Sequence, residues 1–76
     1  MNNKKRARLS LARSRLEEAK SFVETVKDEE EDCLNNLPEN LQEGDRYRMM
    51  EEAVDNLSEA IEHIDGAMDN IDQAQQ

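Results

Sequence analysis

Apolar residues recur at alternating spacings of three and four throughout residues 47–71, and this pattern limits the fold more than any other feature of the chain. The row consists of Tyr47, Met50, Val54, Leu57, Ile61, Ile64, Met68 and Ile71, and alanines accompany it at Ala53, Ala60, Ala67 and Ala74. In an α-helix of 3.6 residues per turn these positions form one stripe. The stripe predicts a long amphipathic helix that needs another helix to cover it.

The opposite side of this helix is acidic. It carries Glu52, Asp55, Glu59, Glu62 and Asp69, and these five residues are called the acidic face below. Acids three and four positions apart on a helix lie about 5–6 Å from one another, which is comparable to the phosphate spacing along a DNA strand. The acidic face therefore predicts either a mimic of nucleic acid that binds a basic groove on a protein partner, or a coat that keeps the helix in solution.

A second helical period occupies the first half of the chain. Its apolar residues are Leu9, Ala12, Leu16, Ala19, Val23 and Val26, with Phe22 and Leu34 widening the stripe and Cys33 continuing it as a buried thiol. We expect a first helix over about residues 4–35, a connection over about 36–44 and a second helix over about 45–74. Pro38 and Gly44 mark the connection, and Asp45 is the expected N-cap of the second helix.

Charge predicts how the two helices pair. Six bases lie near the start of the first helix and five acids near its end, at Lys4, Lys5, Arg6, Arg8, Arg13 and Arg15 and at Asp28, Glu29, Glu30, Glu31 and Asp32. Both groups oppose the helix dipole. Antiparallel pairing brings the bases beside Asp65, Asp69 and Asp72, and the acids near Arg46 and Arg48, so we expect an all-α, coiled-coil-like antiparallel hairpin formed by a single domain, residues 1–76.

The expected seam includes residues from both helices. Its members are Leu9, Leu16, Val23, Met50, Val54, Leu57, Ala60, Ile61, Ile64, Ala67, Met68 and Ile71. In the expected layers Ala12 lies beside Met68, Ala19 beside Ile61 and Val26 beside Val54. Two helices leave apolar area uncovered, so we expect a homodimer, in which two hairpins form a four-helix bundle. The alternative is a monomer whose alanine flank binds a different protein.

Composition excludes several classes of function. The chain has 76 residues and a formal net charge of −9, which disfavours direct binding of nucleic acid and favours a protein partner with a basic surface. A single cysteine allows no intrachain disulfide. No apolar run is long enough to cross a membrane, so we expect no membrane association and a cytoplasmic protein.

No arrangement of residues predicts catalysis. His63 is the one histidine, residue 60 is alanine where a di-iron bundle needs glutamate, and no nucleophilic triad is present. Glu59, Glu62 and Asp65 superficially resemble the metal-binding run of all-α nucleotide pyrophosphohydrolases, but Glu59 and Glu62 lie opposite the seam. We expect no catalytic residue, no metal and no cofactor.

Residues 28–65 resemble a group of short acidic proteins encoded by phages and mobile elements of low-GC Gram-positive bacteria. That group carries an NLPExLQ loop and MEEAIDxLEEAI heptads, and the chain matches it at Asn36-Leu37-Pro38-Glu39, Leu41-Gln42 and Met50-Glu51-Glu52-Ala53. The turn Gly44-Asp45-Arg46-Tyr47-Arg48 departs from the SERGE turn common in the group. The group has no assigned activity, so the resemblance implies a mobile-element setting in a bacterial host cell.

Together these patterns predict a function without catalysis. We expect a phage or mobile-element accessory protein that binds a protein partner, as an inhibitor of a host enzyme or an anti-defence protein acting on a defence complex through the acidic face. The alternative is a structural or assembly element whose acids only solubilise it.

Overall fold

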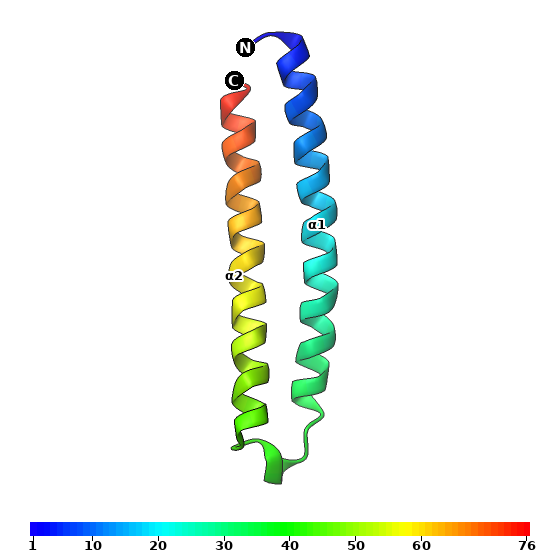
Figure 1. The fold of residues 1–76 in the computed structure, drawn as a ribbon, viewed down its shortest axis with the longest axis vertical. Helices are drawn as coiled ribbons and strands as arrows, with labels where there is room; N and C mark the ends of the chain where they lie inside the picture. Colours follow the sequence, from blue (N-terminus) through cyan, green and yellow to red (C-terminus); the bar gives the residue numbers. More distant parts are fainter.

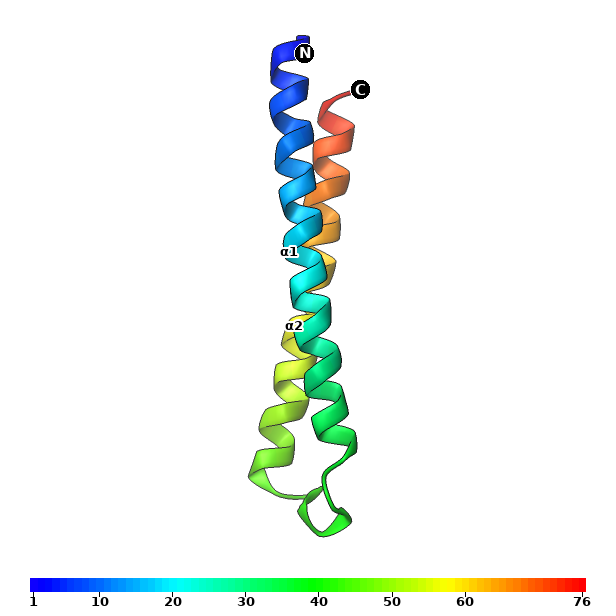
Figure 2. The ribbon, with the colours of Figure 1, turned by 90° about the vertical axis from the view of Figure 1, so that its right-hand side faces the viewer.

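The computed structural model describes all 76 residues, which form two helices and a short connection. Helix α1 spans Asn3–Asn35, the 3-10 helix η1 spans Glu39–Leu41 and α2 spans Asp45–Ala74. Figures 1 and 2 show α1 and α2 side by side with both chain termini at one end of the rod. The Cα atoms extend over 59 × 15 × 13 Å. The expected all-α antiparallel hairpin is thus confirmed.

Polar groups and proline set the end points of α1. The side chain of Asn2 accepts a hydrogen bond of 2.8 Å from the backbone N–H of Lys5, which satisfies one of the donors that a helix start leaves free. At the other end the helix stops at Asn35, three residues before Pro38. Because the residue before a proline is disfavoured in helical conformation, the chain cannot continue α1 through this point.

The connection is held by its own hydrogen bonds. The side-chain amide of Gln42 donates to the carbonyl of Leu37 at 3.1 Å, and Pro38 has the φ of −58° that precedes the η1 turn. Gly44, and not Asp45, is the N-cap of α2, and it gives no side-chain hydrogen bond. Asp45 is the first helical residue, where its negative charge interacts favourably with the positive end of the helix dipole. Its carboxylate pairs with Arg48.

The seam between the helices is centred on α2. Val54 and Met68, 9% and 6% exposed, are the two buried residues of the chain. All other expected seam residues of both helices are half-buried. The contribution of α1 comes mainly from Leu9, Leu16 and Val23, which lie seven residues apart and therefore on one line of the helix.

The orientation of α1 differs from the expected layers. Ala12, Ala19 and Val26 are exposed, and so are Phe22 and Cys33, so the sequence-based predictions that these residues pack in the seam are wrong. Arg13, Lys20 and Lys27 are half-buried on the other side of the Leu9 line instead. At these positions the methyl group of alanine would cover little apolar surface, whereas the long stems of arginine and lysine cover more of it and leave their charged ends in water.

The hairpin exposes more surface than a compact protein of its size. Its accessible area is 5870 Å², whereas a folded monomer of 8.8 kDa has about 4800 Å². The excess of about 1100 Å² follows from the rod shape, in which each helix touches only one neighbour. A rod of this kind gains stability from any partner that covers one of its sides.

Candidate protein-interaction surfaces

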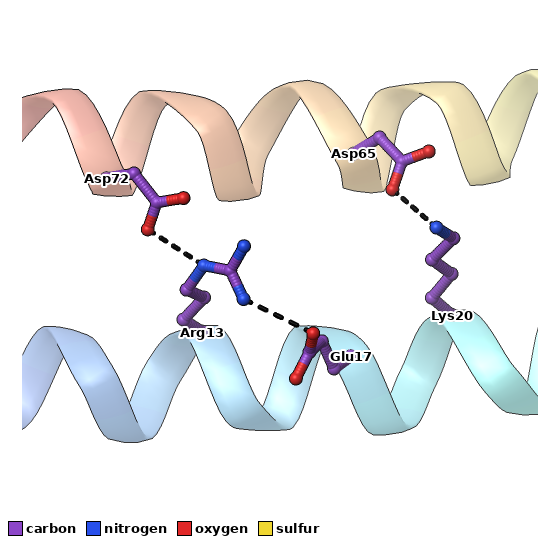
Figure 3. Close-up of polar contacts among 5 residues, drawn as sticks. All are labelled: Arg13, Glu17, Lys20, Asp65 and Asp72. Carbon is purple, nitrogen blue, oxygen red and sulfur yellow. Dashed lines mark hydrogen bonds and ion pairs between the residues drawn. The ribbon is translucent and has the colours of Figure 1, made fainter.

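Ion pairs close one side of the hairpin. Arg13 Nε lies 2.8 Å from an Asp72 oxygen, and Lys20 Nζ lies 2.8 Å from an Asp65 oxygen (Figure 3). Arg13 also lies 3.2 Å from Glu17 on its own helix. The hydrogen bond to Asp72 raises the pKa of Arg13, and the hydrogen bond to Asp65 raises the pKa of Lys20. Both cations therefore stay charged, and their carboxylate partners are neutralised locally.

The two inter-helix pairs fix the register. Along α1 the cations are seven residues apart, and along α2 their partners are seven residues apart in the opposite direction. Seven residues are about two helical turns, so the two ion pairs lie on the same side of the hairpin, two turns apart. Lys27 lies one further repeat along, but Ser58 occupies the corresponding position of α2 and Lys27 pairs with Glu31 at 3.2 Å instead.

The expected pairing at the loop end is wrong. Arg48 pairs with Asp45, three residues away on its own helix, and no ion pair joins Arg46 or Arg48 to the acids at positions 28–32. A neighbour three residues away on the same helix is within reach at little entropic cost, so the local pair forms. Asp69 likewise forms no ion pair with the basic start of α1.

The acidic face lies on the outer side of α2. All five of its residues are exposed and none of them forms an ion pair. Asp65 and Asp72, by contrast, are neutralised by α1. These acids of α2 thus fall into two sets. Asp65 and Asp72 form ion pairs with α1, whereas the five acids of the acidic face are unpaired and create a negative potential in the solvent around them.

A third surface, called here the apolar face, lies on the side of the hairpin away from the ion pairs. Each residue advances the helix by about 100°. On α2 the reference is the line through Ile61 and Met68. Asp65 and Asp72 come four residues after these two and lie about 40° to one side of the line. Ala60 and Ala67 come one residue before them and lie about 100° to the other side. The same arithmetic on α1 places Arg13 and Lys20 on one side of Leu9 and Leu16, and places the rows that begin at Ala12 and Arg15 on the other.

The apolar face therefore combines two rows from each helix. Its α1 members are Ala12, Arg15, Ala19, Phe22, Val26, Glu29 and Cys33, and its α2 members are Met50, Ala53, Leu57, Ala60, Ile64, Ala67 and Ile71. All seven members on α1 are exposed, and all seven members on α2 are half-buried. Phe22 is 74% exposed and Val26 51%, which is unusual for large apolar side chains grouped on one side of a small protein.

Sequence reasoning missed the basic row that closes the seam. This row consists of Arg6, Arg13, Lys20 and Lys27, which are seven residues apart. Its last three members each come four residues after Leu9, Leu16 and Val23, and this regular offset is the sequence pattern that could have identified the row. The spacing of seven matches the spacing of Asp65 and Asp72 on α2. Reading the two rows together predicts the two ion pairs that join the helices.

The residues considered for catalysis or metal binding do not come together in one site. His63 and Cys33 are exposed on different helices, and Glu59 and Glu62 point outward while Asp65 is held by Lys20. No group of three or more histidine, cysteine or acidic side chains is arranged to hold a metal ion. Neither helix is apolar over a long enough stretch to cross a membrane. Comparisons with protein-family models, curated proteins and solved structures give no match to the chain.

Proposed function

We propose that this chain is a non-enzymatic accessory protein of a phage or mobile element that binds a protein partner in the cytoplasm of its bacterial host. The acidic face is the binding surface, and the partner presents a basic groove that ordinarily holds nucleic acid. The partner is a host enzyme or a defence complex, and the bound hairpin inhibits it by occupying the groove. The observation that carries this proposal is the set of five exposed acids without a cationic partner.

The acidic face is held rigid, which favours binding to a partner. Its acids lie on one helix that is supported along its length by α1, so their spacing is fixed before any partner arrives. Binding then costs little ordering of the backbone, and unpaired charges of one sign steer the hairpin toward a positive surface. Attraction of this kind speeds association and weakens as salt is added.

A charge-neutral variant tests the proposal. Replacing Glu52, Asp55, Glu59 and Glu62 by their amides, as Glu52→Gln, Asp55→Asn, Glu59→Gln and Glu62→Gln, keeps side-chain shape and removes four negative charges from the net charge of −9. We expect the wild-type hairpin to capture a basic protein from host-cell extract and this variant to lose it. Circular dichroism checks that the variant remains helical.

A matched control separates this surface from overall charge. The exposed acids Glu24, Asp28, Glu39 and Glu43 form no ion pair and lie outside the acidic face, so their four amide replacements change the net charge equally. The control variant is expected to capture the partner as the wild type does. Undiminished capture by the first variant would refute the proposal, and equal loss in both variants would reduce it to an effect of net charge.

A second candidate function is an assembly element held together by self-association. The exposed apolar side chains of α1, above all Phe22 and Val26, favour it. In that case the acids only solubilise the bundle, and two hairpins form a homodimer through the apolar face. Replacing Ala60 or Ala67 by a bulky residue should then break assembly, while neutralising the acidic face should be tolerated.

A further inference from the structure

We infer that a second copy of this chain docks on the apolar face in the reversed direction, so that α1 lies against α1 and α2 against α2 about a two-fold axis that passes close to Ala19. This inference rests on the proposed self-association and specifies its geometry. It leaves the acidic face of each hairpin on the outside of the bundle.

The exposed apolar side chains of the helices gather on this side. Phe22 and Val26 belong to the apolar face, and Leu11 and Met49, 58% and 69% exposed, lie along its outer edges. No other large apolar side chain of α1 or α2 is strongly exposed. The side with the ion pairs, by comparison, is lined by Glu17, Lys20 and their neighbours. A second hairpin that covers the apolar face therefore covers Phe22 and Val26 and borders on Leu11 and Met49.

The size of the face meets the need of a stable dimer. With the axis at Ala19 the two copies overlap over the 33 residues of α1, about 50 Å, and with a width of 15 Å this overlap has a footprint of about 750 Å². Stable interfaces bury about 800 Å² on each partner. The alanines of both helices leave room for two helix backbones to approach closely, and the larger residues between them fill the layers.

Charge decides the direction of the second copy. Lys4, Lys5 and Arg8 form no ion pair within the hairpin, and neither do Glu29 and Asp32 near the other end of α1. Reversal places each basic end of α1 against the acidic end of the other α1. Both unpaired groups, which oppose the dipole of their own helix, then gain partners of opposite sign.

The unreversed arrangement lacks this complementarity. A two-fold axis along the rods would set α1 against α2 of the second copy. The outer α2 row of the apolar face reads Ala53, Ala60 and Ala67 and continues to Ala74, and the next row outward reads Met49, Asn56, His63 and Asn70. They contain no acid, so the basic end of α1 would face uncharged side chains there.

The row through Ala19 is nearly self-complementary about that residue. With the axis at Ala19, Ala12 lies opposite Val26 of the second copy and Lys5 lies opposite its Cys33, because each pair is equally far from the axis. Arg8 falls within one residue of the position opposite Glu29. A small residue thus meets a large one in the row through Ala19, and in the neighbouring row the base Arg8 meets the acid Glu29.

Disulfide cross-linking tests this geometry. In a Cys33→Ser background, Ala19→Cys places two thiols beside the axis, within the short Cα separation that a disulfide requires. Ser21→Cys in the same background is the control, since Ser21 is also exposed at nearly the same height but lies outside the apolar face. We expect A19C to cross-link at least about tenfold faster than S21C, because thiols held together react at millimolar effective concentration.

Cross-linking through Cys33 tests whether the second copy is reversed. In the reversed dimer the two Cys33 residues are about 40 Å apart along the rods, since each lies fourteen residues from the axis. The wild type should therefore not cross-link, whereas Lys5→Cys with the native Cys33 should cross-link at both ends of the bundle. Non-reducing electrophoresis after equilibration in a glutathione buffer measures all four proteins, and circular dichroism confirms that each is helical.

The outcomes separate the geometry from self-association. A dimeric mass by light scattering with A19C cross-linked and S21C not cross-linked supports the inference. A dimeric mass in which A19C fails to cross-link, or in which S21C cross-links equally well, overturns the geometry and leaves self-association standing. A monomeric mass for the wild type and for both single-cysteine variants overturns self-association itself.

Discussion

Met68 and Met49 offer a comparison that tests where the seam lies. Both are methionines of α2, but Met68 is 6% exposed and Met49 is 69% exposed. Replacement by alanine removes three side-chain heavy atoms, each comparable to a methylene group worth about 0.8 kcal/mol when buried. Scaled by burial, Met68→Ala should lower the free energy of unfolding by about 2 kcal/mol and Met49→Ala by about 0.7 kcal/mol. The cavity contribution is small because the residues around Met68 are themselves half-exposed.

Thermal unfolding followed by circular dichroism measures the difference. For a domain of this size 1 kcal/mol corresponds to about 4–8 °C, so M68A should lower the midpoint by roughly 8–16 °C and M49A by roughly 3–6 °C. Both variants are compared at one protein concentration, because association adds stability that depends on concentration. Equal shifts for the two variants would refute the assignment of the seam to the line through Val54 and Met68.

Three further predictions concern the polar and small residues. Ser58→Glu should give Lys27 a partner across the helices and raise the free energy of unfolding by about 0.2–1 kcal/mol, measured by urea titration, and a Lys27→Met background should abolish the gain. The pKa of Lys20 is raised above its ordinary 10.5, so its ion pair stabilises the hairpin at lower pH and is lost as the pH rises through the folded value. Lys20→Met should remove that alkaline loss from a profile of stability against pH, and an unchanged profile would contradict it. Ala67→Trp should convert a dimer to a monomer by size-exclusion chromatography, whereas Ser21→Trp should not.

The antiparallel hairpin could be predicted because several independent signals agree. The stripe from Tyr47 to Ile71 is long and regular, so α2 is determined by its apolar period alone. Pro38, which is the one proline, and Gly44 mark the place where the chain reverses. Segregated charge on α1 then favours the antiparallel direction, and two of its cations do pair with α2.

The rotation of α1 about its own axis could not be predicted in the same way. Two rows flank the line of Leu9, Leu16 and Val23 at comparable angles, one with Ala12 and Ala19 and the other with Arg13 and Lys20. Hydrophobicity alone favours the alanine row. The structure uses the basic row, because the stems of these residues cover more apolar area than a methyl group and their charged ends reach Asp72 and Asp65.

This rotation leaves α1 with more apolar positions than the seam uses. Leu9, Leu16 and Val23 pack against α2, while Ala12, Ala19 and Val26 keep the same period and remain exposed. A sequence pattern records the sum of all the interfaces that a helix makes, and does not say which row belongs to which. The acidic face illustrates the same limit, because exposure can be predicted from its position but the identity of a partner cannot.

Molar mass in solution tests most directly the claim that the apolar face is an interface between two copies. Light scattering on the wild type at two protein concentrations and two salt concentrations should give twice 8.8 kDa throughout, because an interface of this size is held mainly by apolar contact. A mass of 8.8 kDa under all four conditions would contradict the claim.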